Sequence, residues 1–181
     1  MKSKIIKLIS FFMITILLTG CNNNTKEITK GGNTKYHKKF GSYEVLNGWV
    51  ESKTHSTNNK YFYVKKGDDN KSRPNNVSIN QGKNKYSSSE HVKFRSAITS
   101  QLMEQISKKQ GVNLGAKGSH TKKGYTLYTF TIKEDDSNTV TSLCYIVGDY
   151  KYVLVQETNY DDDNETFEVT KNIINTFEWN N

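Results

Sequence analysis

The chain has 181 residues, of which 26 are lysine or arginine and 18 are aspartate or glutamate, giving a formal net charge of +8. This length suits one domain after a short leader and excludes several large domains. Arg73 and Arg95 are the only arginines. Because arginine best reads bases through two parallel hydrogen bonds, the composition argues against sequence-specific nucleic-acid recognition, and we expect no nucleic-acid partner.

The first twenty residues have the pattern of an export signal. Three lysines among the first seven residues precede an apolar run of eleven residues, Leu8–Leu18. As a helix this run spans only about 16 Å, roughly half of a bilayer core, so a cleaved signal fits better than a permanent span. Leu18-Thr19-Gly20-Cys21 resembles the lipobox of bacterial lipoproteins, in which the cysteine becomes the acylated first residue. An ordinary secretory signal with an incidental Cys21 is the alternative.

Acylation of Cys21, with palmitate or a similar chain, would hold the domain at the extracytoplasmic face of the cell membrane. Removal of the signal leaves 161 residues with a formal charge of about +5. Residues 21–39 are predicted to be the lipidated cysteine and a flexible tether, because Ile28 and Tyr36 alone cannot offset the entropy of ordering them. The folded domain is expected over residues 40–181. Its richness in lysine and asparagine suggests a Gram-positive source.

Short strands are expected in the first half of the domain. The first is expected within residues 41–52, which contain Tyr43, Val45 and Trp49 around Asn47-Gly48, a strong tight-turn signal. Residues 60–66 contain aromatic and β-branched side chains typical of a strand. A polar loop with the only proline follows over 68–76, and a short third strand is expected at 77–79.

Two helices are expected in the second half. The first begins at Ser87, three residues before Glu90 in the spacing of a capping box, and ends at Gly111. Its apolar side chains recur at i, i+4 intervals, which predicts a core-facing stripe of Phe94, Ile98, Leu102 and Ile106. The second helix is expected over 165–177. Further strands are expected at 124–134, 140–147 and 151–158, with a Gly148-Asp149 turn joining the last two.

These strands are apolar on both sides. Val153 and Val155 alternate with Tyr152 and Leu154, so both faces of the central strands should be covered. With two helices available, we expect an α+β fold in the order β-β-β-α-β-β-β-α. The expected architecture is an antiparallel sheet of about six strands with one helix on each face, an α/β/α sandwich.

Several landmarks, in this order, make the chain similar to the PsbP/DcrB-like superfamily of small extracytoplasmic domains. They are Gly48-Trp49, Tyr61-Phe62-Tyr63, Asn76-Val77-Ser78-Ile79, the helix from Ser89, Gly124-Tyr125, Gly148-Asp149 and the closing segment 172–179. The resemblance covers residue 40 to the end. It implies the sandwich fold and an extracytoplasmic location, with no shared catalytic motif to carry over.

Few side chains form a recognisable site. With Cys21 lipidated, Cys144 has no disulfide partner, and its apolar surroundings predict that it packs in the core. The histidines fit no metal or triad motif; they are His37, His55, His91 and His120. The acidic run 161–165 lacks the spacing of a calcium loop and is expected at a helix N-terminus, with calcium as the alternative. We expect no catalytic residue, no cofactor and no metal ion.

Lysine pairs are the remaining candidates for binding. They are Lys65-Lys66, Lys108-Lys109 and Lys122-Lys123. Lys108 and Lys109 are expected near the loop that carries Lys117, Lys122 and Lys123, where they could meet an anionic wall polymer or lipid headgroups. A solvated surface with no partner is the alternative.

The sequence therefore favours a membrane-anchored lipoprotein that acts as a noncatalytic binding or accessory module. One alternative is a subunit of a cell-envelope complex, which would need a protein partner. The other is a cell-surface hydrolase whose catalytic site only the fold would assemble.

Overall fold

The computed structural model describes residues 27–30, 32–135 and 137–180, so the signal and Cys21 lie outside the described residues. The strands are β1 (Glu27–Lys30), β2 (Asn33–Lys38), β3 (Gly41–Val45), β4 (Trp49–Glu51), β5 (Lys60–Lys65), β6 (Asn76–Lys83), β7 (Val112–His120), β8 (Thr126–Glu134), β9 (Val140–Gly148), β10 (Lys151–Asn159) and β11 (Glu178–Trp179). The helices are the 3-10 turn η1 (Ser88–Glu90), α2 (His91–Ile106) and α3 (Asn164–Thr176). None of these described helices is long and apolar enough to cross a membrane.

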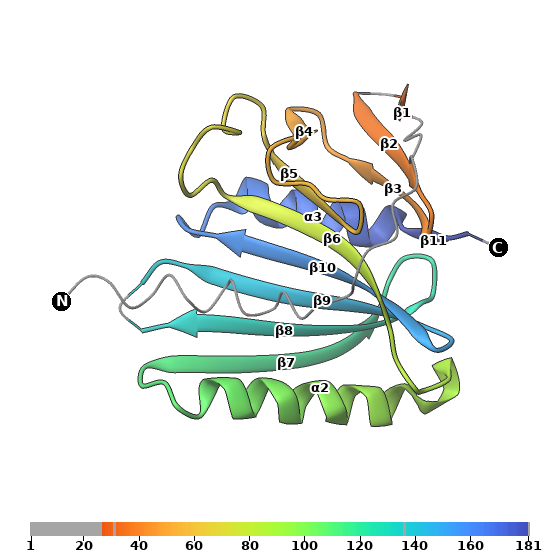
Figure 1. The fold of residues 1–181 in the computed structure, drawn as a ribbon, viewed down its shortest axis with the longest axis vertical. Coiled ribbons are helices and arrows are strands. Elements are labelled where there is room, and N and C mark those ends of the chain that lie inside the picture. The colour runs from red at the N-terminus through yellow and green to blue at the C-terminus, as the bar shows by residue number, and fades with distance from the viewer. Residues whose placement is uncertain (1–26, 31, 136, 181) are drawn as a thin grey trace.

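The strands form two antiparallel sheets (Figure 1). The larger has seven strands in the order β4-β5-β6-β10-β9-β8-β7, and the smaller has four in the order β1-β2-β3-β11. The α+β class, the two helices and the antiparallel pairing are confirmed. The expected single sheet of about six strands is wrong, because β3 leaves the large sheet at the Asn47-Gly48 turn and pairs with β2 and β11 instead.

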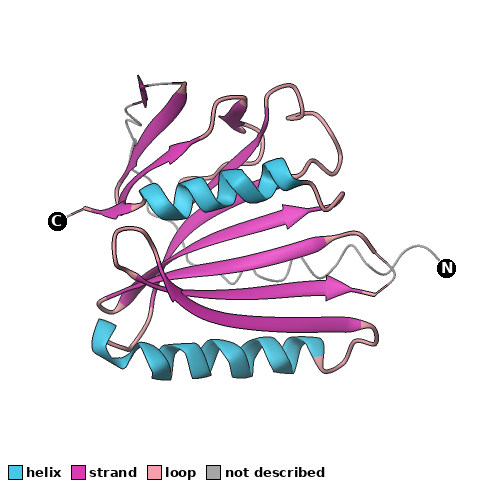
Figure 2. Cartoon of the chain, turned by 180° about the vertical axis from the view of Figure 1, so that it is seen from behind, coloured by secondary structure: helices cyan, strands magenta, loops and turns pink. Residues whose placement is uncertain are grey.

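Two apolar clusters use alternate residues of the same strands. The first contains Cys144, Ile146, Val153 and Val155 of the central strands, together with Val169 and Ile173 of α3. The second contains Leu143, Tyr145 and Leu154 of the same strands, together with Phe94 and Leu102 of α2. Figure 2 shows α3 in front of the strands, while α2 runs along the β7 side of the sheet. The central strands are therefore apolar on both faces, as their alternation predicts.

Both helices begin where their N-terminal signals predict, whereas the first ends at Ile106, five positions before the expected stop at Gly111. The Glu90 carboxylate accepts a hydrogen bond from the Ser87 backbone N–H at 3.3 Å, which is one half of the predicted capping box. At α3, the Asp163 carboxylate accepts from the backbone N–H groups of Glu165 and Thr166. These hydrogen bonds hold the pKa of Asp163 below its ordinary value, and the bond from the Glu165 backbone N–H contributes most. The acidic run therefore begins a helix, as expected.

The predicted tether is wrong for residues 27–30 and 33–38, which form β1 and β2. Tyr36 is 3% exposed and packs edge-on against Tyr63, with ring centroids 5.1 Å apart. Lys38, two residues on, points to the same side. The polar composition of residues 21–39 predicted disorder. In a strand, however, alternate side chains face the same side, so Tyr36 and the aliphatic part of Lys38 both point inward. Pairing with β3 then satisfies the backbone.

Lys38 ends in a buried polar cluster. Its Nζ lies 2.8 Å from Glu51 Oε2 and 3.8 Å from the centre of the Tyr61 ring. The Tyr63 hydroxyl contacts the same Glu51 oxygen at 3.5 Å and the Tyr43 hydroxyl at 2.8 Å. Burial raises the pKa of both tyrosines. A counter-ion and a ring face together compensate a charge that would otherwise be costly to bury.

Strand β7 is the longest of the strands that the sequence did not predict. It pairs with β8 over nine residues without a bulge, from Val112 opposite Glu134 to His120 opposite Thr126. Its sequence contains Gly115 and Gly118, and glycine disfavours strands. Pairing with β8 determines this strand, because its own residues have little preference for it.

Cys144 is buried and forms no disulfide, as predicted. Burial raises the pKa of its thiol to about 12. At pH 8 the thiolate fraction therefore falls by about three orders of magnitude relative to an ordinary cysteine.

We expect iodoacetamide to alkylate Cys144 about a thousandfold more slowly in the folded protein than in guanidinium chloride. The measurement is mass-spectrometric labelling of the full chain carrying Cys21→Ser, so that only one thiol reacts. A Ser89→Cys variant supplies an exposed thiol as the control. Rapid labelling of Cys144 under native conditions would contradict its packing in the core.

Candidate functional site: a basic and aromatic end of the sheet

The lysines that we expected to lie close together are separated by β7. Lys108 and Lys109 precede this strand, whereas Lys122 and Lys123 follow it, and nine residues of strand span about 26 Å. The expectation that they share one end is wrong. The helix and strand run antiparallel, so the turn after α2 and the turn after β7 lie at opposite ends of the sheet (Figure 1).

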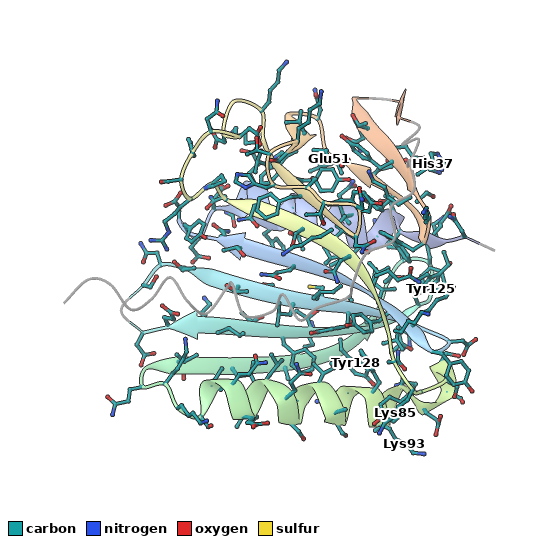
Figure 3. All side chains as sticks on the ribbon, viewed as in Figure 1. His37, Glu51, Lys85, Lys93, Tyr125 and Tyr128 are labelled. Carbon is teal, nitrogen blue, oxygen red and sulfur yellow. The ribbon has the colours of Figure 1, made fainter. Side chains whose placement is uncertain are left out.

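Strand register gathers a different set of lysines. Gly148 pairs with Lys151 at the β9–β10 hairpin, and Lys151 also lies opposite Lys83 of β6. The β7–β8 turn lies at the same end of the sheet, because Leu127 pairs with Ile146. We call this region the hairpin end. Its lysines are Lys39, Lys83, Lys85, Lys122, Lys123 and Lys151. Figure 3 shows Lys85, Lys93 and Tyr125 on this side of the molecule.

The tip of the hairpin is fixed by the segment before α2. The Tyr150 backbone N–H donates to the Tyr86 carbonyl at 2.9 Å, and the Asn84 N–H donates to the Tyr150 carbonyl at 3.0 Å. These bonds hold Tyr150 at a φ of 54°, a left-handed conformation that a bulky residue rarely adopts. The Asp149 carboxylate accepts from the Ser88 N–H at 2.8 Å. The tip therefore presents the Tyr150 ring, 60% exposed, from a fixed backbone.

Trp179 connects the hairpin to the smaller sheet. Lys151 Nζ lies 4.6 Å from the centre of the Trp179 ring, and Lys123 forms an ion pair of 2.6 Å with the neighbouring Glu178. The hydrogen bond to Glu178 raises the pKa of Lys123, and the same contact lowers the pKa of Glu178. On the next side, the Asn180 amide donates to the backbone carbonyls of Lys38 and Lys39. The hairpin end is thus a continuous surface across both sheets.

Acidic side chains gather at the other end. They follow β5, β8 and β10 where those strands end, and they are Asp68, Asp69, Glu134, Asp135, Asp161, Asp162 and Asp163. At the hairpin end the described acids are Glu178, Asp149 and Glu90, each held by a partner described above or by Lys93. Basic side chains lie at that other end as well, and they are Lys65, Lys66, Lys71, Arg73, Lys108 and Lys109. The two signs therefore nearly balance there, and the excess of positive charge lies at the hairpin end.

The sequence missed this set for a topological reason. The Gly148-Asp149 turn was predicted, but the pairing of β6 with β10 joins residues about seventy positions apart. Nothing in the local pattern shows that Lys83 lies opposite Lys151. Trp179 reaches Gly148 only because β11 pairs with β3.

The other candidate residues do not converge on a reactive site. His91 is half-buried, and its Nδ1 lies 2.7 Å from the Tyr128 hydroxyl. Among residues 27–30, 32–135 and 137–180, no three histidine, cysteine, aspartate or glutamate side chains form a group that could hold a metal ion.

Glu157 is a buried acid in the first apolar cluster's neighbourhood. It is 3% exposed, and the Asn159 side-chain amide donates to it at 3.5 Å. Burial raises the pKa of Glu157, with a smaller contribution from the charges of Asp162 and Asp163. A raised pKa means that the folded state keeps the proton to higher pH than the unfolded chain does. Stability from this group is therefore complete near pH 4 and is lost as the pH rises through the folded pKa.

We expect Glu157→Gln to remove that loss. The variant should match the wild type in stability at pH 4 and exceed it at pH 7, as measured by urea unfolding at both values. Asp161→Asn, at an exposed acid nearby, is the control and should leave the pH dependence unchanged. An equal difference at both pH values would show that Glu157 ionises normally in the fold.

No family model and no curated protein matches the chain. Among solved structures, it is similar to the solution structure of cyanobacterial PsbP (CyanoP) from Synechocystis sp. PCC 6803. The identity is 12%, the TM-score is 0.45, and the match covers 90% of this chain and 99% of that one.

Proposed function

We propose that this chain is a lipid-anchored extracytoplasmic protein whose domain is a noncatalytic binding or accessory module. Cys21 carries the lipid in this proposal, and the domain is an α/β/α sandwich of the PsbP/DcrB-like kind. The ordered sequence landmarks support that assignment. The two clusters also support it, since α2 contributes to one and α3 to the other.

The observation that carries the proposal is where the chain enters the domain. Glu27 of β1 pairs with Tyr36, which stands two residues before Lys38 at the hairpin end. Five residues lie between Cys21 and Glu27, and the six Cα-to-Cα steps across them reach at most about 20 Å. An anchor on Cys21 therefore keeps the basic hairpin end near the membrane.

The chemistry of the hairpin end suits anionic headgroups. Each lysine near a negatively charged bilayer contributes about 1 kcal/mol, and one acyl chain binds stably only with a second signal such as a basic patch. Tyr150 adds an aromatic ring with a polar tip, the kind of side chain that is enriched at membrane interfaces. In this proposal the lipid anchors the domain and the lysines orient it.

Two experiments test the proposal. Labelling cells with a palmitate analogue should mark the wild type and leave Cys21→Ser unmarked; equal labelling would refute the anchor. For orientation, the lipidated protein is placed in phosphatidylglycerol vesicles with a headgroup acceptor dye, and a donor dye is attached at Tyr150→Cys or at Asp161→Cys. Energy transfer should be stronger from position 150. The difference should shrink with Lys85→Glu and Lys151→Glu together, and persist with the control Lys66→Glu.

A further inference from the structure

Strand β7 is an open edge of the large sheet. It stands at the end of the strand order and pairs only with β8 among the described strands. Gly115, Ala116, Lys117 and Gly118 are all exposed. Because the two glycines have no side chain, their exposure is exposure of the main chain. Unpaired N–H and C=O groups are therefore presented to solvent along the middle of the strand.

Most edges of this kind are protected, and the other edges here are. Strand β4 has three residues and β1 has four, too short to accept much of a partner. Strand β7 has nine residues, no proline and no bulge. Its main protective feature is one charge, that of Lys117. A long regular edge of this kind is the template on which an extended peptide adds as a further strand.

The charges along this edge favour a negatively charged partner. Lys108 and Lys109 lie before the strand, Lys117 in its middle and Lys122 after it. None of these four forms an ion pair with a described residue. Glu134 and Asp135 lie beside the first pair and offset part of its charge, so the excess is greatest from Lys117 onward.

A second copy of the chain is a poor occupant. Antiparallel pairing of two β7 strands would bring Lys108 and Lys109 of one copy beside Lys122 of the other. Parallel pairing would bring equal lysines together. Either arrangement places like charges opposite one another, which destabilises strand pairs. An acidic strand meets the same edge with opposite charges.

We propose that β7 binds an acidic, extended segment of a protein partner by strand addition. The main chain of β7 supplies hydrogen bonds, and Lys117 and Lys122 face carboxylates of the added strand. This inference does not depend on the lipid anchor, and it shares only Lys122 with the hairpin end. It identifies a surface through which the domain would join a larger assembly.

The test uses a fluorescein-labelled peptide of eight alternating threonine and glutamate residues and the full chain in neutral detergent. We expect saturable binding by anisotropy and slower amide exchange over residues 112–120. Lys117→Glu should weaken binding at least tenfold, whereas Lys66→Glu, an exposed lysine beyond β5, should change it less than twofold.

Three results would overturn the proposal. The first is equal binding of a peptide with the same charges but alternate backbone nitrogens methylated, since that peptide cannot complete the ladder. The second is equal binding of polyphosphate with the same dependence on Lys117, which would indicate a site for anionic polymer. The third is a dimer by light scattering that Lys117→Glu strengthens and the peptide does not dissociate, which would place a second copy on β7.

Discussion

Replacing Phe177 with alanine is expected to destabilise the domain by about 3–5 kcal/mol, the range for losing a fully buried aromatic side chain. Phe177 has no exposed surface and lies where α3 ends and β11 begins. Its ring contacts rings from both sheets, with centroid distances of 6.4 Å to Phe40, 6.2 Å to Tyr125 and 4.9 Å to Trp179. The cavity would therefore weaken the helix, the small sheet and the hairpin end together.

Thermal unfolding followed by circular dichroism measures this effect, as a fall in Tm of roughly 10 °C. Phe177→Leu keeps most of the volume and should cost less than about 1.5 kcal/mol. Phe167→Ala is the matched control on the same helix, because Phe167 is 52% exposed, and it should change stability by less than about 0.5 kcal/mol. Similar losses for Phe177→Ala and Phe167→Ala would mean that the ring cluster is not the centre of the core.

The second large effect is expected at the buried ion pair. Glu51→Leu removes the carboxylate 2.8 Å from the Lys38 ammonium, whose side chain is only 1% exposed. Burial without that counter-ion should cost about 2–4 kcal/mol, somewhat below the range for a pair in which both partners are fully buried, because Glu51 retains 23% exposure. Urea unfolding measures the loss.

A double variant separates the ion pair from packing. Lys38→Met with Glu51→Leu removes both charges and keeps apolar volume, so it should recover most of the stability that Glu51→Leu loses. Lys65→Met breaks an exposed pair with Glu165 at 2.6 Å and should cost less than about 1 kcal/mol. If the double variant is no more stable than Glu51→Leu, the buried charge is not the source of the loss.

Local periodicity predicted the elements whose own residues determine them. The stripe from Phe94 to Ile106 predicted α2, and alternating apolar residues predicted β9 and β10 within a residue of their ends. Strand β7 was not predicted because Gly115 and Gly118 carry no strand signal. Strand β2 was not predicted because the alternation from Tyr36 to Lys38 is only three residues long and lies within a polar segment.

Local sequence pattern could not predict which distant strands pair with each other. Whether β3 joins the large sheet or a second one depends on β11, more than 130 residues later. For the same reason, local pattern does not show that two lysines of the hairpin end, Lys83 and Lys151, lie opposite each other, since they meet through the β6–β10 ladder. Turn chemistry predicted the hairpin itself, and only the fold shows what surrounds it.

The pairing of Ser42 with Glu178 also has a consequence for folding kinetics. The hairpins from β7 to β10 join neighbours in the chain and need only short loops to close. Strands β1, β2 and β3 of the small sheet also pair as neighbours, but adding β11 to β3 requires closure of a loop that contains almost every other element. Such contacts form slowly because entropy is lost before they contribute. We therefore expect the meander to form early and β11 to join the small sheet last.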